Sequence, residues 1–173
     1  MTIAYRTPTL ADAEALTALG RRSFVETFGH LYARADLDTF LTEVFGPKGM
    51  PVELAGNAYT FRVAEDDADL IGYCKVGPLF LAAPDDGRGK IELCQLYVLK
   101  PWQGTGVAAA LMDWALAHAR AKGHDDMYLS VWSENHRAQR FYARYGFEEV
   151  GRHDFMVGSQ ADDDHIWRLK LRG

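Results

Sequence analysis

The stretch LYVLKPWQGTGVAAALMDWAL, Leu96 to Leu116, decides which fold the chain is expected to adopt. An apolar, strand-like run ends at Lys100-Pro101, and Gln103-Gly104-Thr105-Gly106 then leads into an Ala- and Leu-rich run typical of a helix. Glycines let the backbone approach a ligand closely, and the unpaired N–H groups at a helix start favour an anion such as a pyrophosphate. The stretch therefore predicts either an anion-binding loop or a tight strand-to-helix turn that binds nothing.

Two common phosphate-binding loops do not fit this stretch. A P-loop needs a lysine directly after its second glycine, and none is present here. A dinucleotide-binding loop needs a third glycine, but Ala109 occupies that position. Any anion bound here is therefore expected to be held by backbone N–H groups.

Length and composition predict one ordinary domain over residues 1–173. The chain is 48% hydrophobic and 25% charged, and its formal net charge of −5 argues against a nucleic-acid partner. No apolar run approaches the ~18 residues of a membrane span, and none resembles a signal peptide, so we expect a cytoplasmic protein without a membrane partner. No Cys/His spacing resembles a zinc site, so no metal is expected, and Cys74 and Cys94 are expected to be small buried thiols.

Hydrophobic periodicity predicts a mixed α/β sheet in the order β-α-α-β-β-β-α-β-α-β-β. Helices are expected near residues 10–28, 34–45, 104–122 and 135–146, and the run GPKGMP at 46–51 is expected to break the helical pattern. A hairpin is expected over 58–77, and strands near 2–8, 90–98, 126–133, 147–157 and 164–171. The acidic run Asp162-Asp163-Asp164 is expected to lie in a solvated turn before the last strand.

Two blocks of the sequence resemble the GNAT superfamily of N-acetyltransferases. Gln103-x-x-Gly106-x-Ala108 is similar to its acyl-CoA motif, and SENHRAQRFYARYGFEEVG, Ser133 to Gly151, resembles its second conserved segment. More loosely, SFVETFGHLY near the N-terminus and GRHDFMVGSQADDDHIWRLKL near the C-terminus resemble the PaiA-type spermidine/spermine acetyltransferases. The resemblance implies a central, mostly antiparallel, twisted sheet that is splayed between two parallel strands and flanked by helices. It also implies acetyl-CoA as cosubstrate and transfer of acetyl to an amine.

The resemblance further implies which residues hold acetyl-CoA. The glycine loop would bind the pyrophosphate through backbone amides, and the splayed strand before it would pair with the pantetheine arm. Asn135 would contact that arm while also capping the helix that follows it. The implied cofactor-binding residues are Leu96, Tyr97, Val98, Gln103, Gly104, Thr105, Gly106, Val107, Ala108, Asn135, Ala138 and Tyr142.

Two residues are predicted to carry the chemistry. Tyr142 matches the general-acid tyrosine of the family, although packing of its aromatic ring is the alternative, and Tyr145 is the fallback. Glu92 is the candidate base, since a strand period of two places it on one face with Cys94 and Leu96. A water-exposed glutamate at the strand edge is the equally weighted alternative for Glu92. Cys94 as an acyl-carrying nucleophile is disfavoured, because buried cysteines are mostly inert.

The acceptor is expected to be a small cationic amine, with a polyamine as one candidate. Aromatic faces and carboxylates recognise ammonium groups. The predicted substrate-binding residues are Glu26, Phe28, Tyr32 and His153. The alternatives are a protein or peptide amine as acceptor, and a non-catalytic acyl-CoA sensor. The resemblance also leaves open a homodimer, because GNAT domains often pair through their C-terminal strands.

Overall fold

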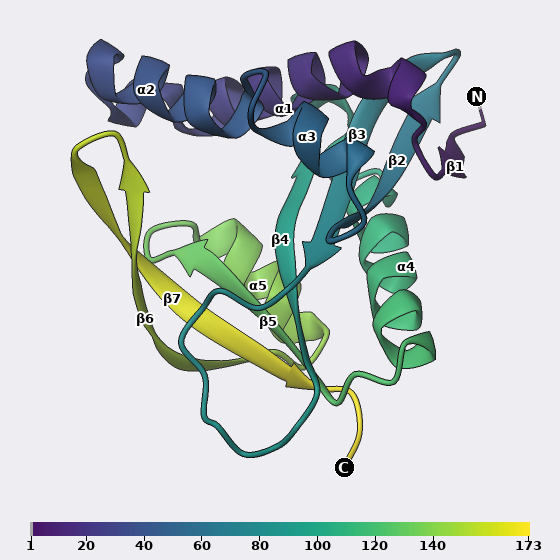
Figure 1. The fold of residues 1–173 in the computed structure, drawn as a ribbon, viewed down its shortest axis with the longest axis vertical. Coiled ribbons are helices and arrows are strands. Elements are labelled where there is room, and N and C mark those ends of the chain that lie inside the picture. The colour runs from purple at the N-terminus through teal and green to yellow at the C-terminus, as the bar shows by residue number, and fades with distance from the viewer. Residues whose placement is uncertain (1) are drawn as a thin grey trace.

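A computed structural model describes residues 2–173 of the chain and shows one twisted sheet with helices on both faces (Figure 1). Seven strands pair in the order β1-β2-β3-β4-β5-β7-β6. The strands are β1 (Ala4–Arg6), β2 (Thr60–Asp66), β3 (Asp69–Gly77), β4 (Lys90–Val98), β5 (Asp126–Trp132), β6 (Glu148–Val157) and β7 (Gln160–Lys170). The α-helices are α1 (Ala13–Phe28), α2 (Arg34–Phe45), α3 (Met50–Ala55), α4 (Val107–Ala121) and α5 (His136–Arg144), with short 3₁₀ turns η1 (Leu10–Asp12), η2 (Gly29–Leu31) and η3 (Lys100–Trp102).

The predicted order of elements is confirmed, with one helix added. Helix α3 forms where GPKGMP is expected only to break the pattern. Pro51 lies in the first turn of this helix, where a proline costs no hydrogen bond because the N–H of that turn has no partner within the helix. No helix within residues 2–173 combines the length and the hydrophobicity that crossing a membrane requires.

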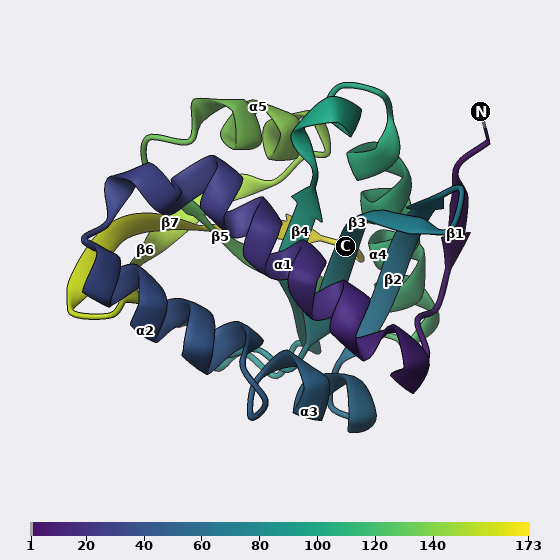
Figure 2. The same cartoon turned by 90° about the horizontal axis from the view of Figure 1, so that it is seen from above.

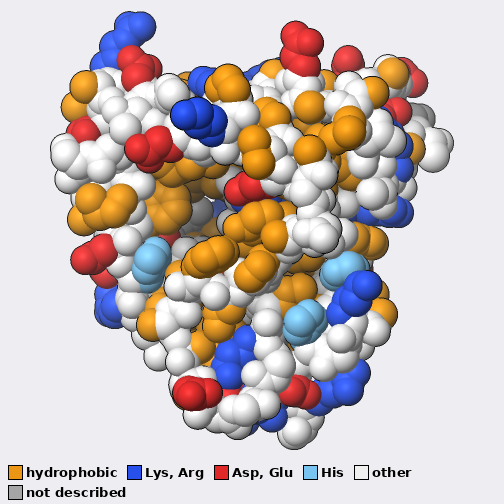
Figure 3. Space-filling model, viewed as in Figure 1, with side chains coloured by type: hydrophobic (Ala, Val, Ile, Leu, Met, Phe, Trp, Pro, Cys, Tyr) orange, Lys and Arg blue, Asp and Glu red, His pale blue; other side chains and the backbone are white. Residues whose placement is uncertain are grey.

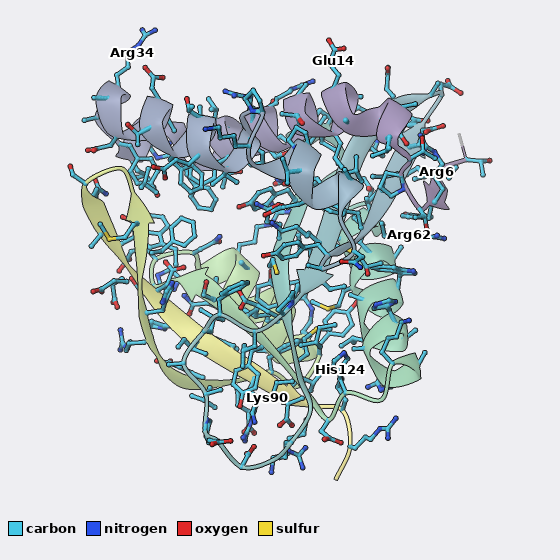
Figure 4. The ribbon with its side chains drawn as sticks, in the orientation of Figure 1. Arg6, Glu14, Arg34, Arg62, Lys90 and His124 are labelled. Atoms are coloured by element: carbon cyan, nitrogen blue, oxygen red, sulfur yellow. The ribbon has the colours of Figure 1, made fainter. Side chains whose placement is uncertain are left out.

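Two apolar clusters cover the two faces of the sheet. One cluster packs α4 and α5 against the sheet and contains Leu111, Met112 and Leu129. The other packs α1 to α3 against the opposite face and contains Leu16, Phe24 and Tyr73, as the view from above illustrates (Figure 2). Charged side chains on the outer face of the helical layer, such as Glu14 and Arg34, point away from the sheet (Figure 4).

The central strands β4 and β5 are the only parallel pair of the described sheet, and they separate after a short contact. They pair at Lys90↔Asp126, Ile91↔Met127 and Glu92↔Tyr128, and then diverge (Figure 1). Beyond Glu92, the edge of β4 that faces β5 therefore has no strand partner. The predicted splay between two parallel strands is confirmed.

A β-bulge at Cys94 changes which residues of β4 share a face. Val76 pairs with Leu93 and Lys75 pairs with Gln95, which leaves Cys94 as the extra residue. The bulge places Leu93 in the same core cluster as Leu96. The expectation that Glu92 and Cys94 share a face with Leu96 is therefore wrong, because a strand period of two does not continue through a bulge.

The last hairpin is longer than expected. Strand β7 begins at Gln160, and Gly158-Ser159 forms the turn. At this turn, Asp36 at the start of α2 accepts hydrogen bonds from the backbone N–H and the hydroxyl of Ser159, at 2.8 and 2.9 Å. The expectation that Asp162 to Asp164 form a solvated turn is wrong. These residues pair with β6, and their alternation sends Asp162 and Asp164 to the face that carries Phe155.

Candidate active site

A cavity of about 760 Å³ occupies the opening between β4 and β5. Its walls come from α1, the end of β4, the glycine loop, the end of β5, α5 and β7. The space-filling view shows a hollow between the helices α1 and α2 and the β6–β7 hairpin, with hydrophobic side chains around its mouth (Figure 3). Because α1 and α5 cover opposite faces of the sheet, the cavity connects both faces through the splay.

The glycine loop forms one end of the cavity. Gly104 and Gly106 have φ angles of 78° and 93°, a left-handed conformation that favours glycine, and Gly106 is the N-cap of α4. A Cβ atom at either position would meet no atom within 4 Å, so the space above the loop is open. A helix N-terminus beneath open space suits a pyrophosphate, and the loop therefore fits the cofactor that the resemblance implies.

Most of the predicted cofactor residues line the cavity, and two do not. Thr105 turns its hydroxyl to the carbonyl of Trp102 at 2.5 Å, and the Val107 side chain is buried in the core. The side chains of these two residues are therefore not placed against the cavity. The predicted residues that line it are Leu96, Tyr97, Val98, Gln103, Gly104, Gly106, Ala108, Asn135, Ala138 and Tyr142.

Gln103 and Asn135 fix the backbone around this end. The side-chain amide of Gln103 donates to the carbonyl of Val98 at 2.9 Å, and its oxygen accepts a hydrogen bond from Arg137. Asn135 caps α5 by accepting from the backbone N–H of Ala138 at 3.2 Å. Asn135 therefore has the capping role that its position predicts, and it also lines the cavity.

The structure separates the two candidate tyrosines of α5. Tyr142 lines the cavity, and burial raises the pKa of its phenol well above the ordinary value. The hydroxyl of Tyr145 instead contacts α4, at 3.2 Å from the carbonyl of Ala109 and 3.1 Å from Asp113. Tyr142 can therefore present its proton to a group in the cavity, whereas Tyr145 is held outside it.

Glu92 does not line the cavity. One oxygen of its carboxylate accepts hydrogen bonds from the backbone N–H groups of Phe80 and Leu81, at 2.8 and 3.3 Å. The structure thus gives Glu92 a role in holding the loop before β4, and its predicted role as base has no support from this placement. Cys94 does line the cavity, and burial raises the pKa of its thiol to about 12, which keeps it unreactive at neutral pH.

The predicted acceptor residues are brought together in part. Phe28 and Tyr32 line the cavity, and the ring of Phe28 meets that of Trp132 edge-on at 6.3 Å. Glu26 also lines it: its Oε1 lies 2.8 Å from Arg22, while its Oε2 is buried without a hydrogen-bond partner. His153 is not a wall residue, although it lies directly opposite Asp164 in the β6–β7 ladder.

Two acidic residues of the site are not among the predicted site residues, because the sequence favours a solvated turn for them. Asp162 and Asp164 both line the cavity, and Asp162 accepts hydrogen bonds from the hydroxyl of Tyr32 and, at 2.9 Å, from the amide of Gln160. The signal that could have found them is Gly158-Ser159, a two-residue hairpin turn that starts the last strand early enough to include both.

Charge divides the cavity into two halves. Basic side chains come from η3 and α5, and acidic ones come from α1 and β7. Phosphate groups suit the first half, which also contains the glycine loop, and a cation suits the second. The basic residues are Lys100, Arg137, Arg140 and Arg144, and the acidic residues are Glu26, Asp162 and Asp164.

Known proteins resemble both the sequence and the fold. A profile of the acetyltransferase (GNAT) family matches residues 22–147. An uncharacterized N-acetyltransferase of Mycobacterium tuberculosis is 31% identical over 162 residues, which cover 94% of this chain and 99% of that protein. The spermine/spermidine N(1)-acetyltransferase of Bacillus subtilis is 28% identical over 90 residues, which cover 51% of this chain and 59% of that protein. The crystal structure of PaiA N-acetyltransferase from Thermoplasma acidophilum, in complex with coenzyme A, has a TM-score of 0.77 at 22% identity and covers 98% of this chain and 99% of that chain.

These similarities agree with the geometry of the cavity. The family match spans the splayed strands, the glycine loop and α5, which together form the half of the cavity that suits coenzyme A. The mixed seven-stranded sheet with its parallel β4–β5 splay is the GNAT fold. The chain belongs to the acetyltransferase (GNAT) family and is an acetyl-CoA-dependent N-acetyltransferase.

Proposed function

We propose that the acceptor is a primary amine of a small cationic molecule, with polyamines as the leading class. The observation that carries this proposal is the acidic half of the cavity, where Glu26, Asp162 and Asp164 lie among aromatic side chains. Carboxylates and aromatic faces are the groups that bind ammonium ions. Three carboxylates in one half-cavity suit an acceptor with more than one positive charge.

The other half of the cavity supports acetyl-CoA as the donor. The unpaired edge of β4 offers backbone groups of Leu96, Tyr97 and Val98 to an extended pantetheine arm, as an added strand would use them. The basic side chains and the open glycine loop suit the phosphates. This arrangement would place the thioester near the splay, beside Tyr142.

Tyr142 is the proposed general acid. When the amine has attacked the thioester carbonyl and the carbon–sulfur bond breaks, the thiolate needs a proton. The raised pKa of Tyr142 keeps its phenol protonated throughout the neutral range. The hydroxyl can therefore donate that proton at any pH at which the enzyme is expected to work.

A peptide or protein acceptor is the second candidate, and one contact disfavours it. The hydrogen bond between Tyr32 and Asp162 joins the segment after η2 to β7. This link narrows the acidic half of the cavity, where the acceptor would bind. A polypeptide needs a long open groove, whereas a small amine needs only a short approach. The name of the Bacillus subtilis relative, a spermine/spermidine acetyltransferase, points in the same direction as this contact.

The test is acetyl-CoA turnover, followed by release of the free thiol, against a panel of amines. The panel contains spermidine, spermine, short diamines, aminoglycosides, amino acids and a lysine peptide. We expect the highest kcat/KM with polyamines and weak turnover of the neutral or zwitterionic acceptors. Preferred turnover of the lysine peptide would replace the proposal with the peptide alternative. Tight acetyl-CoA binding without turnover of any amine would favour a sensor.

A further inference from the structure

One carboxylate in the acidic half of the cavity is buried without an ion-pair partner. Asp164 is only 5% exposed, and no cation is paired with it among the described residues. The other buried charged side chains are paired: Lys75 lies 2.8 Å from Glu53, and Asp126 lies 2.7 Å from Arg88. Burial of an unpaired carboxylate costs free energy, which makes a functional reason for its retention reasonable.

The strand pairing places Asp164 at the opening between β4 and β5. In the sheet, Asp164 lies directly opposite Trp132, the last residue of β5, and both side chains line the cavity. Burial is the main cause of the raised pKa values of Tyr97 on β4 and of Tyr32 beside α1, and the charge of Asp164 adds to both. Tyr142 also contributes to that of Tyr97. Asp164 is therefore close to the acceptor wall and to the end of β4 where the thioester is expected.

We propose that Asp164 is the general base of the transfer and takes a proton from the ammonium group of the acceptor. This inference rests on the proposed function, because it requires an amine in the acidic half of the cavity. Asp164 takes the role of base that the sequence predicts for Glu92, because the Glu92 carboxylate is bound to backbone N–H groups outside the cavity.

The protonation behaviour of Asp164 supports this role. Burial, the largest cause, raises its pKa to about 7; the Ser130 hydroxyl acts in the opposite direction, and the charges of Asp162 and Asp163 raise it. A general base is most effective when its pKa lies near the working pH, since a large fraction of it is then ionised and it is still basic enough to accept a proton. The titratable groups nearest the carboxylate are Tyr32 after η2, Tyr97 on β4, His153 on β6, and Asp162 and Asp163 on β7. Glu26 on α1 lines the same cavity.

The proton balance of the reaction is complete with these groups. Asp164 removes one proton from the ammonium group, and the neutral nitrogen forms a bond to the carbonyl carbon. As the carbon–sulfur bond breaks, Tyr142 gives its proton to the departing thiolate. The nitrogen then loses a second proton, which restores the Tyr142 phenol, and Asp164 releases its proton to water. The net products are the amide, the free thiol of coenzyme A and one proton.

The test compares pH profiles of kcat/KM for Asp164→Asn, Asp164→Glu and the wild type with the best polyamine acceptor. We expect the wild-type rate to rise through a pKa near 7 and then level off. Asp164→Asn is expected to lose about 10²-fold or more at pH 7, the usual contribution of a general base. Its rate should keep rising toward the pKa of the free amine, about 10, because only the neutral amine can then react. Asp164→Glu should recover part of the rate and the level region of the profile.

Asp163→Asn is the matched control, because Asp163 lies on the other face of the same strand and pairs with Arg152 at 2.9 Å. It should keep the plateau rate of the wild type, and the rise of its profile should shift slightly to lower pH, because the charge of Asp163 contributes to the raised pKa of Asp164. Calorimetric titration with coenzyme A checks that every variant is folded and binds the cofactor normally. An Asp164→Asn enzyme with the wild-type profile and rate would overturn the base assignment while leaving the proposed function intact. A wild-type enzyme that acetylates no amine would instead overturn the proposed function.

Discussion

The hydroxyl of Tyr32 donates a hydrogen bond to the carboxylate of Asp162 and joins the helical layer to the C-terminal hairpin beside the cavity. The two residues are 130 positions apart in sequence. Gln160 holds the second oxygen of Asp162 at 2.9 Å, so the charge of this carboxylate has a fixed position in the acceptor half. The proposed acceptor site is thus assembled from both ends of the chain.

We expect Asp162→Asn to raise the KM for a polyamine about tenfold, with kcat changed by less than about threefold. The reason is that Asp162 attracts the bound cation without touching the reacting nitrogen, and a tenfold change corresponds to about 1.4 kcal/mol of binding free energy. Steady-state kinetics with spermidine and with a monoamine measure the effect, which should be smaller for the monoamine. An equal KM in the variant and the wild type would remove Asp162 from acceptor binding.

We expect Tyr142→Phe to lower kcat by about 10²-fold and to leave the affinity for acetyl-CoA unchanged, because the phenylalanine keeps the ring but has no proton to donate. Tyr145→Phe is the matched control on the same helix. It loses the contacts with Ala109 and Asp113, which should cost about 1 kcal/mol of stability while the turnover is kept. Equal loss of kcat in both variants would show that packing of α5, and not proton donation, is what matters.

We expect Ala108→Leu to weaken coenzyme A binding by tenfold or more, measured by calorimetry. Ala108 lies in the first turn of α4 and lines the cavity, so a larger side chain would fill space beside the open glycine loop. Leucine is a good helix former, which keeps the helix itself intact. Ala117→Leu, at an exposed position of the same helix, is the control. Unchanged affinity in Ala108→Leu would place the cofactor elsewhere.

We expect Glu92→Gln to reduce kcat by no more than about threefold and to lower the melting temperature. Its carboxylate accepts hydrogen bonds from two backbone N–H groups, and the neutral amide accepts them more weakly. Thermal unfolding and the pH profile of kcat/KM measure both effects. If this variant, and not Asp164→Asn, shows the large loss and the altered profile, Glu92 regains the role of base.

We expect the stability of the wild type to fall relative to Asp164→Asn as the pH rises from about 4 to 8. The folded-state pKa of Asp164 is about 7, above its ordinary value of 3.8, so the unfolded chain releases the proton first. Stability from this group is full at low pH and is lost as the pH rises through the folded-state pKa. The free energy of unfolding of Asp164→Asn should exceed that of the wild type by about 1–3 kcal/mol at pH 8 and by little at pH 4. Urea unfolding at the two pH values measures this difference. A pH-independent difference would contradict the raised pKa.

The sequence predicts the fold well, and the cofactor-binding residues that the family resemblance implies come from short stretches of the chain. The glycine loop, the helix that follows it and the alternating strands can each be predicted from a short stretch of consecutive residues. Gly104, Gly106, Asn135 and Tyr142 all line the cavity. A loop and a helix start need only neighbouring residues to form an anion site. Local patterns together with the resemblance are therefore enough to find residues that line one cavity, and their contacts with the cofactor stay a prediction.

The acceptor half could not be predicted in the same way. The bulge at Cys94 arises from the pairing of β3 with β4, so nothing in the period of β4 alone shows that Glu92 and Leu96 belong to different faces. The acidic composition around Asp162 and Asp164 predicts a polar turn. Only the pairing of β7 with β5 and β6 makes these residues part of a strand and directs them to the cavity. These features depend on contacts between distant strands.

If the acceptor is a cationic amine, as proposed, the three carboxylates of the acceptor half also affect the release of the product. An acetylated nitrogen is an amide and no longer carries a positive charge, so the product has one positive charge fewer than the substrate. Glu26, Asp162 and Asp164 attract it correspondingly less. On this proposal, the enzyme would bind its acetylated product less tightly than its substrate, and a fully charged amine would displace the product. A monoamine would leave most readily, and a polyamine that keeps its other charges would stay longer.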